Sequence, residues 1–365
     1  MTKKNKILIA TGGTGGHIFP AYSLANYLIK KNFNIKVSTD NRGFKYLKDY
    51  KNLDLIKIPT SPLIKKNMLI FFYSGLTIFF SILRSLIFLL LNRPSLVIGM
   101  GGYASFPICI AATLLRINFV VYENNLIIGK ANKYLLPFTK LIFVSYKELE
   151  GIPLKYEKKT FEVGNIIRDE MYSSEIKNMQ NDEFDSIKIL VLGGSQAAEV
   201  FAFKLPQIFE KLKKSGLSIK VFQQCQSKQN TQLSKFYENT GIDFEIFNFT
   251  NEIKEYYSKA NLVITRSGAS VLGELINFKI PFICVPLPTS SDGHQLKNAT
   301  YYIKKGYGYL VEEKDLNDKL FALIKNIFED KSLIENILIN QRQYSDKNIF
   351  KKINTHIEKI INEKN

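Results

Sequence analysis

The chain has 365 residues, a hydrophobic share of 45% and a formal net charge of +17 at pH 7. The length favours two domains and the hydrophobic share is enough to give each a core, so we predict a globular protein. The three cysteines are odd in number and lack metal-ligand spacing, which argues against a disulfide framework and favours reduced thiols inside the cell.

The positive charge favours anionic partners, such as nucleotide phosphates or an acidic lipid surface. Lysine spread over the whole surface would explain much of the same charge. The sequence contains no recognisable nucleic-acid-binding module, so we expect no nucleic acid partner. The basic N-terminus leads directly into a short apolar run and a glycine turn, and it lacks the long apolar core of a signal peptide.

Two sets of short apolar runs alternate with helical stretches, which is the pattern of buried parallel strands. The first set lies at 6–10, 35–39, 55–58, 96–100, 119–122 and 141–144, and the second at 187–192, 219–222, 244–247, 262–265 and 282–285. Residues 165–186 are polar and lack apolar periodicity, which predicts a linker. We expect a first domain over residues 1–163, a second over 164–343, and a C-terminal helix within 344–365 that could pack back on the first domain.

The segment 68–91 is apolar enough to raise the question of a membrane span. Its polar residues recur at steps of three and four, at Ser74, Thr77, Ser81 and Arg84. They predict a polar stripe along one helix face, and Arg84 would cost about 2.5 to 3.5 kcal/mol at the bilayer centre. We therefore predict a helix that packs on the sheet and offers its apolar surface, with Lys65 and Lys66, to an anionic membrane. A buried helix and a contact with another subunit remain alternatives.

Three glycine-rich turns follow predicted strands and open into predicted helices. They lie at 10–17 (Ala-Thr-Gly-Gly-Thr-Gly-Gly-His), 99–103 (Gly-Met-Gly-Gly-Tyr) and 193–196 (Gly-Gly-Ser-Gln). Glycine lets backbone N–H groups approach an anion closely, and the following helix adds unpaired N–H groups and the positive end of its dipole. Because the turns are split between the two predicted domains, they indicate a phosphate-rich ligand.

The first turn does not match the dinucleotide fingerprint G-x-G-x-x-G. Read from Gly13, that pattern needs glycine at position 18, where Ile18 stands. Asp40 lies near the end of the second predicted strand, where an acid that binds ribose would sit, so a nicotinamide-dependent enzyme remains an alternative. The sequence has no Asp-x-Asp pair to clamp a metal-bound diphosphate. We therefore expect helix N-termini to meet the charge of the phosphate-rich ligand, without a metal or another cofactor.

A series of motifs resembles, in order along the chain, those of the MurG family of N-acetylglucosaminyltransferases. The motifs lie at 12–20, 99–103, 123–125, 163–168, 193–196, 266–274 and 292–298. The resemblance implies a GT-B fold, in which two Rossmann-like domains with parallel sheets flank a cleft. It also implies metal-independent, inverting transfer of N-acetylglucosamine (GlcNAc) from UDP-GlcNAc to the 4-hydroxyl of undecaprenyl-pyrophosphoryl-N-acetylmuramoyl-pentapeptide. This reaction belongs to peptidoglycan synthesis, and the enzyme would sit peripherally on the cytoplasmic face of the inner membrane.

The resemblance assigns most of the site residues to the donor. Those implied to bind UDP-GlcNAc are Thr14, Gly15, Gly16, Asn125, Arg168, Ser195, Thr250, Ala269, Ser270, Val271, Glu274 and Gln295. Ser195 and the backbone of 269–271 would cradle the diphosphate, and Glu274 would accept from the ribose hydroxyls. Thr250 would contact uracil, and Gln295 and Asn125 would contact the sugar. The residues implied to bind the acceptor pyrophosphate are Gly13, Gly101, Gly102 and Tyr103.

His17, in the first glycine turn, is the candidate catalytic residue. An ordinary histidine has a pKa near 6.5, so its imidazole could accept the proton of the 4-hydroxyl as that oxygen attacks the anomeric carbon. A histidine in such a turn can also simply bond to the neighbouring backbone.

Several positions depart from the family pattern. Asn124 stands where Gln is usual, Ala197 where Gly is usual, Glu199 where a basic residue is common, and Gly293-His294 where Arg-Gln is usual. Two alternatives stay open, a related UDP-sugar transferase acting on diacylglycerol and a non-catalytic subunit that binds a sugar nucleotide.

Overall fold

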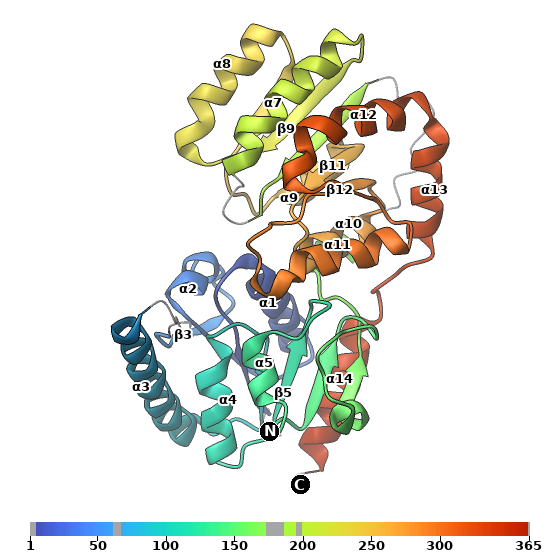
Figure 1. Cartoon of the computed structure of the whole chain (residues 1–365). Coiled ribbons are helices and arrows are strands. Elements are labelled where there is room, and N and C mark those ends of the chain that lie inside the picture. Colours follow the sequence, from blue (N-terminus) through green and yellow to red (C-terminus); the bar gives the residue numbers. More distant parts are fainter. Residues whose placement is uncertain (1–4, 61–66, 173–185, 195–198, 364–365) are drawn as a thin grey trace. The chain divides into compact units, whose positions relative to one another are not determined.

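The computed structural model describes residues 5–60, 67–172, 186–194 and 199–363 (Figure 1). The chain divides into two compact units. The first unit holds Met1–Arg168 together with Asp346–Asn365, and the second holds Asp169–Ser345. Each unit is built around one fully parallel sheet covered by helices, as the apolar runs predict.

The sheet of the first unit has the strand order β3-β2-β1-β4-β5-β6-β7. Its strands are β1 (Lys6–Ala10), β2 (Asn34–Thr39), β3 (Asp54–Lys57), β4 (Leu96–Gly99), β5 (Phe119–Glu123), β6 (Leu141–Val144) and β7 (Thr160–Glu162). The central strands β1, β4 and β5 are almost continuously apolar because helices cover them on both faces.

Chain direction decides which face of the sheet each helix covers. The helices of this unit are α1 (Gly15–Lys30), α2 (Asn41–Leu47), α3 (Met68–Asn92), α4 (Ser105–Leu114), α5 (Lys130–Leu135) and α14 (Ile349–Asn362), with a 3-10 helix at Leu154–Lys159. The chain moves one way across the sheet through α1 and α2 and the other way through α3, α4 and α5. Right-handed crossovers therefore place these two groups on opposite faces. The C-terminal helix α14 contacts α1 and β4.

The second unit repeats this topology with the strand order β10-β9-β8-β11-β12-β13. Its strands are β8 (Ile187–Leu192), β9 (Ile219–Gln224), β10 (Asp243–Phe247), β11 (Leu262–Thr265), β12 (Phe282–Cys284) and β13 (Tyr309–Leu310). Its helices are α6 (Asp169–Tyr172), α7 (Glu199–Lys214), α8 (Asn230–Thr240), α9 (Ile253–Lys259), α10 (Ala269–Phe278), α11 (His294–Lys304), α12 (Leu316–Glu329) and α13 (Lys331–Arg342), with 3-10 helices at Ser227–Gln229, Ser291–Gly293 and Glu313–Asp315.

The start of the predicted linker is part of the core of the first unit. Asn165, Ile166 and Ile167 are buried. The backbone N–H of Asn165 donates to Oδ1 of Asp346 (3.1 Å) and its Nδ2 donates to the hydroxyl of Tyr146 (2.8 Å). The two segments by which the chain leaves and re-enters the first unit are therefore hydrogen-bonded to each other.

Helix α3 turns its small polar side chains inward and its large apolar side chains outward. Ser74, Ser81 and Ser85 are buried, and the hydroxyl of Ser81 donates to the carbonyl of Pro59. The exposed side chains recur at helical spacing and form what we call the apolar face of α3: Leu69, Phe72, Tyr73, Leu76, Phe79, Phe80, Leu83, Ile87, Leu90 and Leu91. Arg84, the fourth residue of the predicted polar stripe, is exposed.

By length and composition, α3 is the one helix in the described parts of the chain that could cross a membrane, and 22% of its most apolar stretch is buried. Lys65 and Lys66, predicted to flank it, lie outside the described residues.

Candidate substrate-binding site

Two glycine turns meet at the carboxyl edge of the first sheet. One turn follows β1 and the other follows β4, and these strands are hydrogen-bonded neighbours. The chain leaves the edge in opposite directions after them, so the turns lie at the topological switch point, where parallel sheets bind ligands. Gly13, Gly101 and Gly102 have positive φ angles of 85°, 83° and 74°, which side-chain-bearing residues rarely adopt.

His17 lies against the second turn. A Cβ added to Gly101 would be 3.0 Å from Cε1 and 3.1 Å from Nδ1 of His17, and one added to Gly102 would be 3.5 Å from Cδ2. Gly101 therefore makes room for the imidazole, whereas a Cβ on Gly102 would be in ordinary van der Waals contact with the ring. The structure thus brings together His17, the candidate catalytic residue, and two of the residues predicted to bind pyrophosphate.

Hydrogen bonds hold the first turn of α1 in place. The N–H of His17 donates to the carbonyl of Thr14 (3.1 Å), and the hydroxyl of Thr11 donates to the carbonyl of His17 (2.9 Å). Thr14 is the exposed N-cap and makes no side-chain cap. Gly15 is buried and Gly16 is half-buried. The N-terminus of α1, where the positive end of the helix dipole lies, is thus at His17.

The carboxylate of Asp40 accepts hydrogen bonds from backbone N–H groups, which is not the ribose-binding role that its position suggested. Its Oδ1 accepts from the N–H of Gly43 (2.7 Å), where it caps α2, and from the N–H of Gly13 (3.2 Å). The side chain is buried, and Arg42 approaches its Oδ2 at 3.6 Å. These bonds give the carboxylate a structural role, so the nicotinamide alternative loses its main support.

A buried carboxylate organises the turn after β5. Oε1 of Glu123 accepts from the backbone N–H (3.1 Å) and from Nδ2 (3.0 Å) of Asn125, while Oε2 accepts from the N–H of Gly129 (2.8 Å) and Nδ2 of Asn132 (3.0 Å). Asn125, predicted to contact the sugar, is therefore oriented by Glu123. Glu123 belongs to the motif at 123–125, but the resemblance assigns it no role.

Tyr103 and Arg168 are the remaining predicted site residues of the first unit. Tyr103 is 39% exposed, and its carbonyl accepts from the hydroxyl of Thr60 (3.4 Å). The guanidinium of Arg168 lies 5.1 Å from the ring centroid of Phe19 on α1, which is a cation–π contact.

The second sheet has an equivalent switch point, between β8 and β11. Gly193 and Gly194 follow β8, and Gly194 has a φ angle of 80°. Residues 266–268 follow β11 and lead into α10, whose first turn contains the predicted Ala269, Ser270 and Val271. The first turn of a helix presents backbone N–H groups and the positive end of the helix dipole, which makes this turn a suitable cradle for a diphosphate. Ser195 and Ala197 lie outside the described residues.

Glu274 and Gln295 are both held by neighbouring groups. Oε2 of the buried Glu274 accepts from the hydroxyl of Tyr257 (2.9 Å), a residue that the sequence analysis missed. Oε1 of Gln295 accepts from the N–H groups of Ser267 (3.2 Å) and Leu287 (2.9 Å). Gln295 thus ties α11 to the turn that precedes α10.

The loop after β10 contains Thr250, which is half-buried. Its hydroxyl accepts from the N–H of Glu252 (3.0 Å) just before α9. Arg266 stabilises the turn after β11 from within, because its guanidinium donates to the carbonyls of Val285 and Pro286 (3.2 Å each) and pairs with Glu313.

None of the described residues form a group of three or more His, Cys, Asp or Glu side chains that could hold a metal ion. The three cysteines, Cys109, Cys225 and Cys284, are buried and unpaired with one another. Burial raises the pKa of the Cys284 thiol to about 12. Such a thiol stays protonated at neutral pH and is a poor nucleophile or metal ligand.

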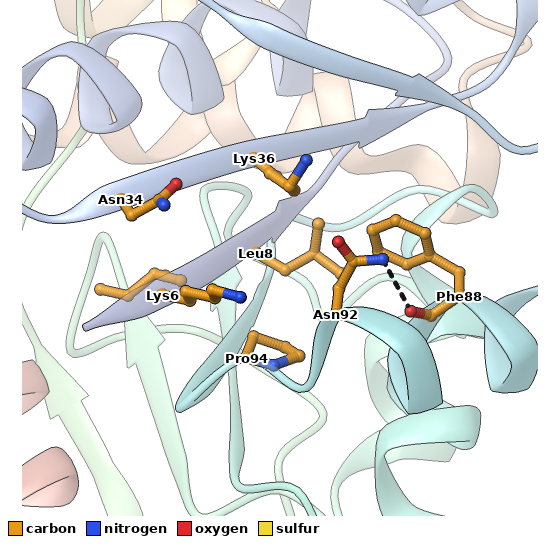
Figure 2. A pocket seen from close by; sticks show the side chains of 8 residues that line it. Lys6, Leu8, Asn34, Lys36, Phe88, Asn92 and Pro94 are labelled. Carbon is orange, nitrogen blue, oxygen red and sulfur yellow. Dashed lines mark hydrogen bonds between the residues drawn. The ribbon is translucent and has the colours of Figure 1, made fainter. Parts of the chain in front are cut away.

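A small cavity lies between α3 and the amino ends of β1 and β2 (Figure 2). It is lined by Lys6, Ile7, Leu8, Asn34, Lys36, Phe88, Asn92 and Pro94. The glycine turns follow the carboxyl ends of strands in this sheet, so the cavity lies at the opposite edge. It contains none of the predicted site residues.

Two family models match the chain. They are the glycosyltransferase family 28 N-terminal domain over residues 7–144 and the glycosyltransferase family 28 C-terminal domain over residues 188–356. Among curated relatives named UDP-N-acetylglucosamine–N-acetylmuramyl-(pentapeptide) pyrophosphoryl-undecaprenol N-acetylglucosamine transferase, that of Pelagibacter ubique is 34% identical over 98% of this chain and 99% of its own length. That of Rickettsia bellii is 33% identical over 93% of this chain and 96% of its own length.

Solved structures support the fold. Acinetobacter baumannii MurG matches with a TM-score of 0.78 at 21% identity, covering 98% of this chain and 100% of that one. The S. aureus MnaA–UDP complex matches with a TM-score of 0.71 at 15% identity, covering 98% and 97%. The predicted GT-B class with two parallel Rossmann-like sheets is confirmed. The identity to curated relatives extends along nearly the whole sequence, and the chain therefore belongs to glycosyltransferase family 28, among its MurG-type N-acetylglucosamine transferases.

Proposed function

We propose that the chain transfers GlcNAc from UDP-GlcNAc to the 4-hydroxyl of undecaprenyl-pyrophosphoryl-N-acetylmuramoyl-pentapeptide, forming a β-1,4 bond in peptidoglycan synthesis. The names of the curated relatives carry this donor and this acceptor. The structural observation that supports it most is the position of His17, which lies against Gly101 and belongs to the other glycine turn of the same switch point.

In the proposed reaction, the 4-hydroxyl oxygen attacks the anomeric carbon of GlcNAc from the side opposite UDP. The bond from that carbon to the β-phosphate oxygen breaks, and UDP leaves with the electron pair. His17 accepts the proton of the hydroxyl, a general-base role typically worth about 10² to 10⁴ in rate. The configuration at the anomeric carbon is inverted.

The proposed donor site draws mainly on the second unit. The first turn of α10, with Ala269, Ser270 and Val271, would bind the diphosphate through its N–H groups and helix dipole. Glu274 would accept from the ribose, held in place by Tyr257. Thr250 would contact uracil, and Gln295 would contact the sugar. Main-chain donors and the dipole would then stabilise the charge on the departing UDP without a metal ion.

The residues of the first unit that we propose to bind the donor are Thr14, Gly15, Gly16, Asn125 and Arg168. Gly13, Gly101, Gly102 and Tyr103 would bind the acceptor pyrophosphate. The close approach that glycine permits at these turns supports this assignment.

We also propose that the apolar face of α3 rests on the cytoplasmic leaflet of the inner membrane, where the acceptor resides. Its large apolar side chains point away from the first unit, and a continuous apolar surface of this kind marks a membrane or protein contact. The net charge of +17 favours an anionic surface, with Lys65 and Lys66 proposed to contribute.

Turnover of the purified full chain with two lipid acceptors tests the proposal. Release of UDP from UDP-GlcNAc should require the undecaprenyl-linked muramyl pentapeptide, and diacylglycerol should not support it. Glu274→Ala should abolish this release by weakening donor binding. Equal turnover with diacylglycerol would instead favour the related glycolipid transferase.

A further inference from the structure

Helix α1 has a proline within its second turn. Pro20 has no N–H, so it cannot donate the usual helical hydrogen bond to the carbonyl four residues earlier, which is that of Gly16. Gly16 immediately precedes His17. The carbonyl that loses its usual donor to Pro20 therefore belongs to the residue next to the proposed base.

A side chain from a distant part of the sequence donates to the carbonyl of Gly16 instead. Nδ2 of Asn124 donates to the carbonyl of Gly16 at 2.9 Å, across 108 positions of the sequence. Asn124 follows β5 directly and is only 4% exposed. Its amide thus substitutes for the N–H that Pro20 lacks.

The network around Glu123 orients the Asn124 amide. Oδ1 of Asn124 accepts from Nδ2 of Asn125 (3.0 Å), and the same Nδ2 donates to Oε1 of Glu123 (3.0 Å). With its oxygen engaged, the amide presents its nitrogen to Gly16. The carbonyl of Gly16, which cannot receive a hydrogen bond from Pro20, therefore receives one from the oriented amide of Asn124.

We infer that Asn124 is a positioning residue, which holds the first turn of α1 and with it the imidazole of His17 against Gly101. This role rests on the proposed function of His17. It assigns a purpose to Asn124, which departs from the Gln usual in the family. A second hydrogen bond, from the hydroxyl of Thr11 to the carbonyl of His17, holds the same turn.

Removing the amide donor should misplace the base without removing it. We expect Asn124→Ala to lower kcat by about 10- to 100-fold, the range for a small displacement of a catalytic group. The KM for UDP-GlcNAc should change little. Asn124→Asp keeps the size but cannot donate when ionised, so it should be at least as impaired. The matched control is Asn340→Ala, whose Nδ2 also donates to a glycine carbonyl, that of Gly306 (3.2 Å), and which should keep its kcat.

The decisive variant restores the missing donor in the helix itself. In Asn124→Ala/Pro20→Ala, residue 20 regains an N–H for the carbonyl of Gly16, so kcat should recover to within about threefold of that of Pro20→Ala alone. A merely structural role for Asn124 would give no such rescue. Undiminished kcat in Asn124→Ala, or an unrescued double variant with a native melting curve, would overturn the inference.

Hydrogen exchange separates this inference from the proposed function. The amides of residues 17–19 should exchange faster in Asn124→Ala and return to the rate of Pro20→Ala in the double variant, whatever reaction the protein catalyses. If exchange follows this pattern while the wild-type chain shows no transfer, the proposed function fails and the positioning contact stands. Unchanged exchange in Asn124→Ala would contradict the contact itself.

Discussion

The imidazole of His17 packs on the backbone of Gly101, with Cε1 only 3.0 Å from the place that a Cβ on Gly101 would occupy. The two residues belong to turns that follow neighbouring strands, β1 and β4. Any side chain at position 101 must therefore displace the histidine or the turn. This contact makes the glycine a determinant of the position of the proposed base.

We expect Gly101→Ala to lower kcat by about 10- to 100-fold through displacement of His17. It should also lower the free energy of unfolding by about 1–2 kcal/mol, because alanine is strained at a φ of 83°. Steady-state kinetics and chemical denaturation measure the two effects. Gly216→Ala is the control, since Gly216 has a φ of 92° but no atom within 4 Å of an added Cβ. It should lose comparable stability and keep its kcat. An equal loss of kcat in both variants would refute the role of the His17 contact.

His17→Ala should reduce kcat by about 10² to 10⁴ if His17 is the general base. Binding of UDP-GlcNAc, measured by calorimetry in the absence of acceptor, should be nearly unchanged. Full turnover in this variant would remove His17 from the catalytic role.

Tyr257→Phe should raise the KM for UDP-GlcNAc by about three- to tenfold with little change in kcat. The variant removes the hydroxyl that donates to Glu274, and a hydrogen bond to a charged group contributes about 1.5–3 kcal/mol, part of which water can replace. Tyr237→Phe is a matched control, because the buried hydroxyl of Tyr237 donates to Gln223 instead. If both variants changed the KM equally, the link between Tyr257 and the donor would be lost.

Phe80→Asp should weaken binding of the protein to anionic phospholipid vesicles by about tenfold or more, because a large apolar side chain contributes about 1.5–3 kcal/mol when it is buried. Phe80 is 62% exposed on the apolar face of α3. Phe203 is 57% exposed on α7 of the second unit, so Phe203→Asp makes the same change elsewhere and should bind vesicles normally. Vesicle sedimentation compares the two, and equal binding of both variants would argue against α3 as the membrane contact.

Acid should destabilise the packing of α14. His356 packs against the rings of Phe143 and Phe161, and burial, with a smaller effect from Lys359, lowers its pKa below the ordinary value. As the pH falls through about 6.5, the unfolded state binds more protons than the folded state, so the free energy of unfolding decreases.

The Tm of the wild-type chain should therefore fall between about pH 7.5 and about pH 5.5, and more steeply than that of His356→Gln. Parallel melting curves would assign the acid sensitivity to other groups.

The sequence was most informative where local pattern determines structure. A central strand such as β4 is buried on both faces and therefore appears as an uninterrupted apolar run. The edge strands β7 and β13 were not predicted because they are short and half-exposed, and their pairing depends on the neighbouring strand. Spacing placed Arg84 on the same helix face as Ser74 and Ser81, but spacing alone does not show how far the buried part of that face extends, and Arg84 is exposed.

In the site, as in the fold, the locally encoded features were predictable and the long-range contacts were not. Glycine turns and His17 have local signatures, whereas the bonds from Asn124 to Gly16 and from Tyr257 to Glu274 join residues far apart in sequence. Strand order determines such pairs, and sequence spacing does not reveal them. Asp40 shows that a local signature can also mislead. Its position at the end of a strand suggested a ribose ligand, but its carboxylate caps α2.

The most direct test of the account follows labelled GlcNAc from its UDP donor to the undecaprenyl-linked muramyl pentapeptide, with and without excess EDTA. We predict that UDP and labelled disaccharide lipid appear in equal amounts and at the same rate in both conditions. Loss of transfer in EDTA with recovery on adding magnesium, or UDP release without a labelled lipid product, would contradict the account.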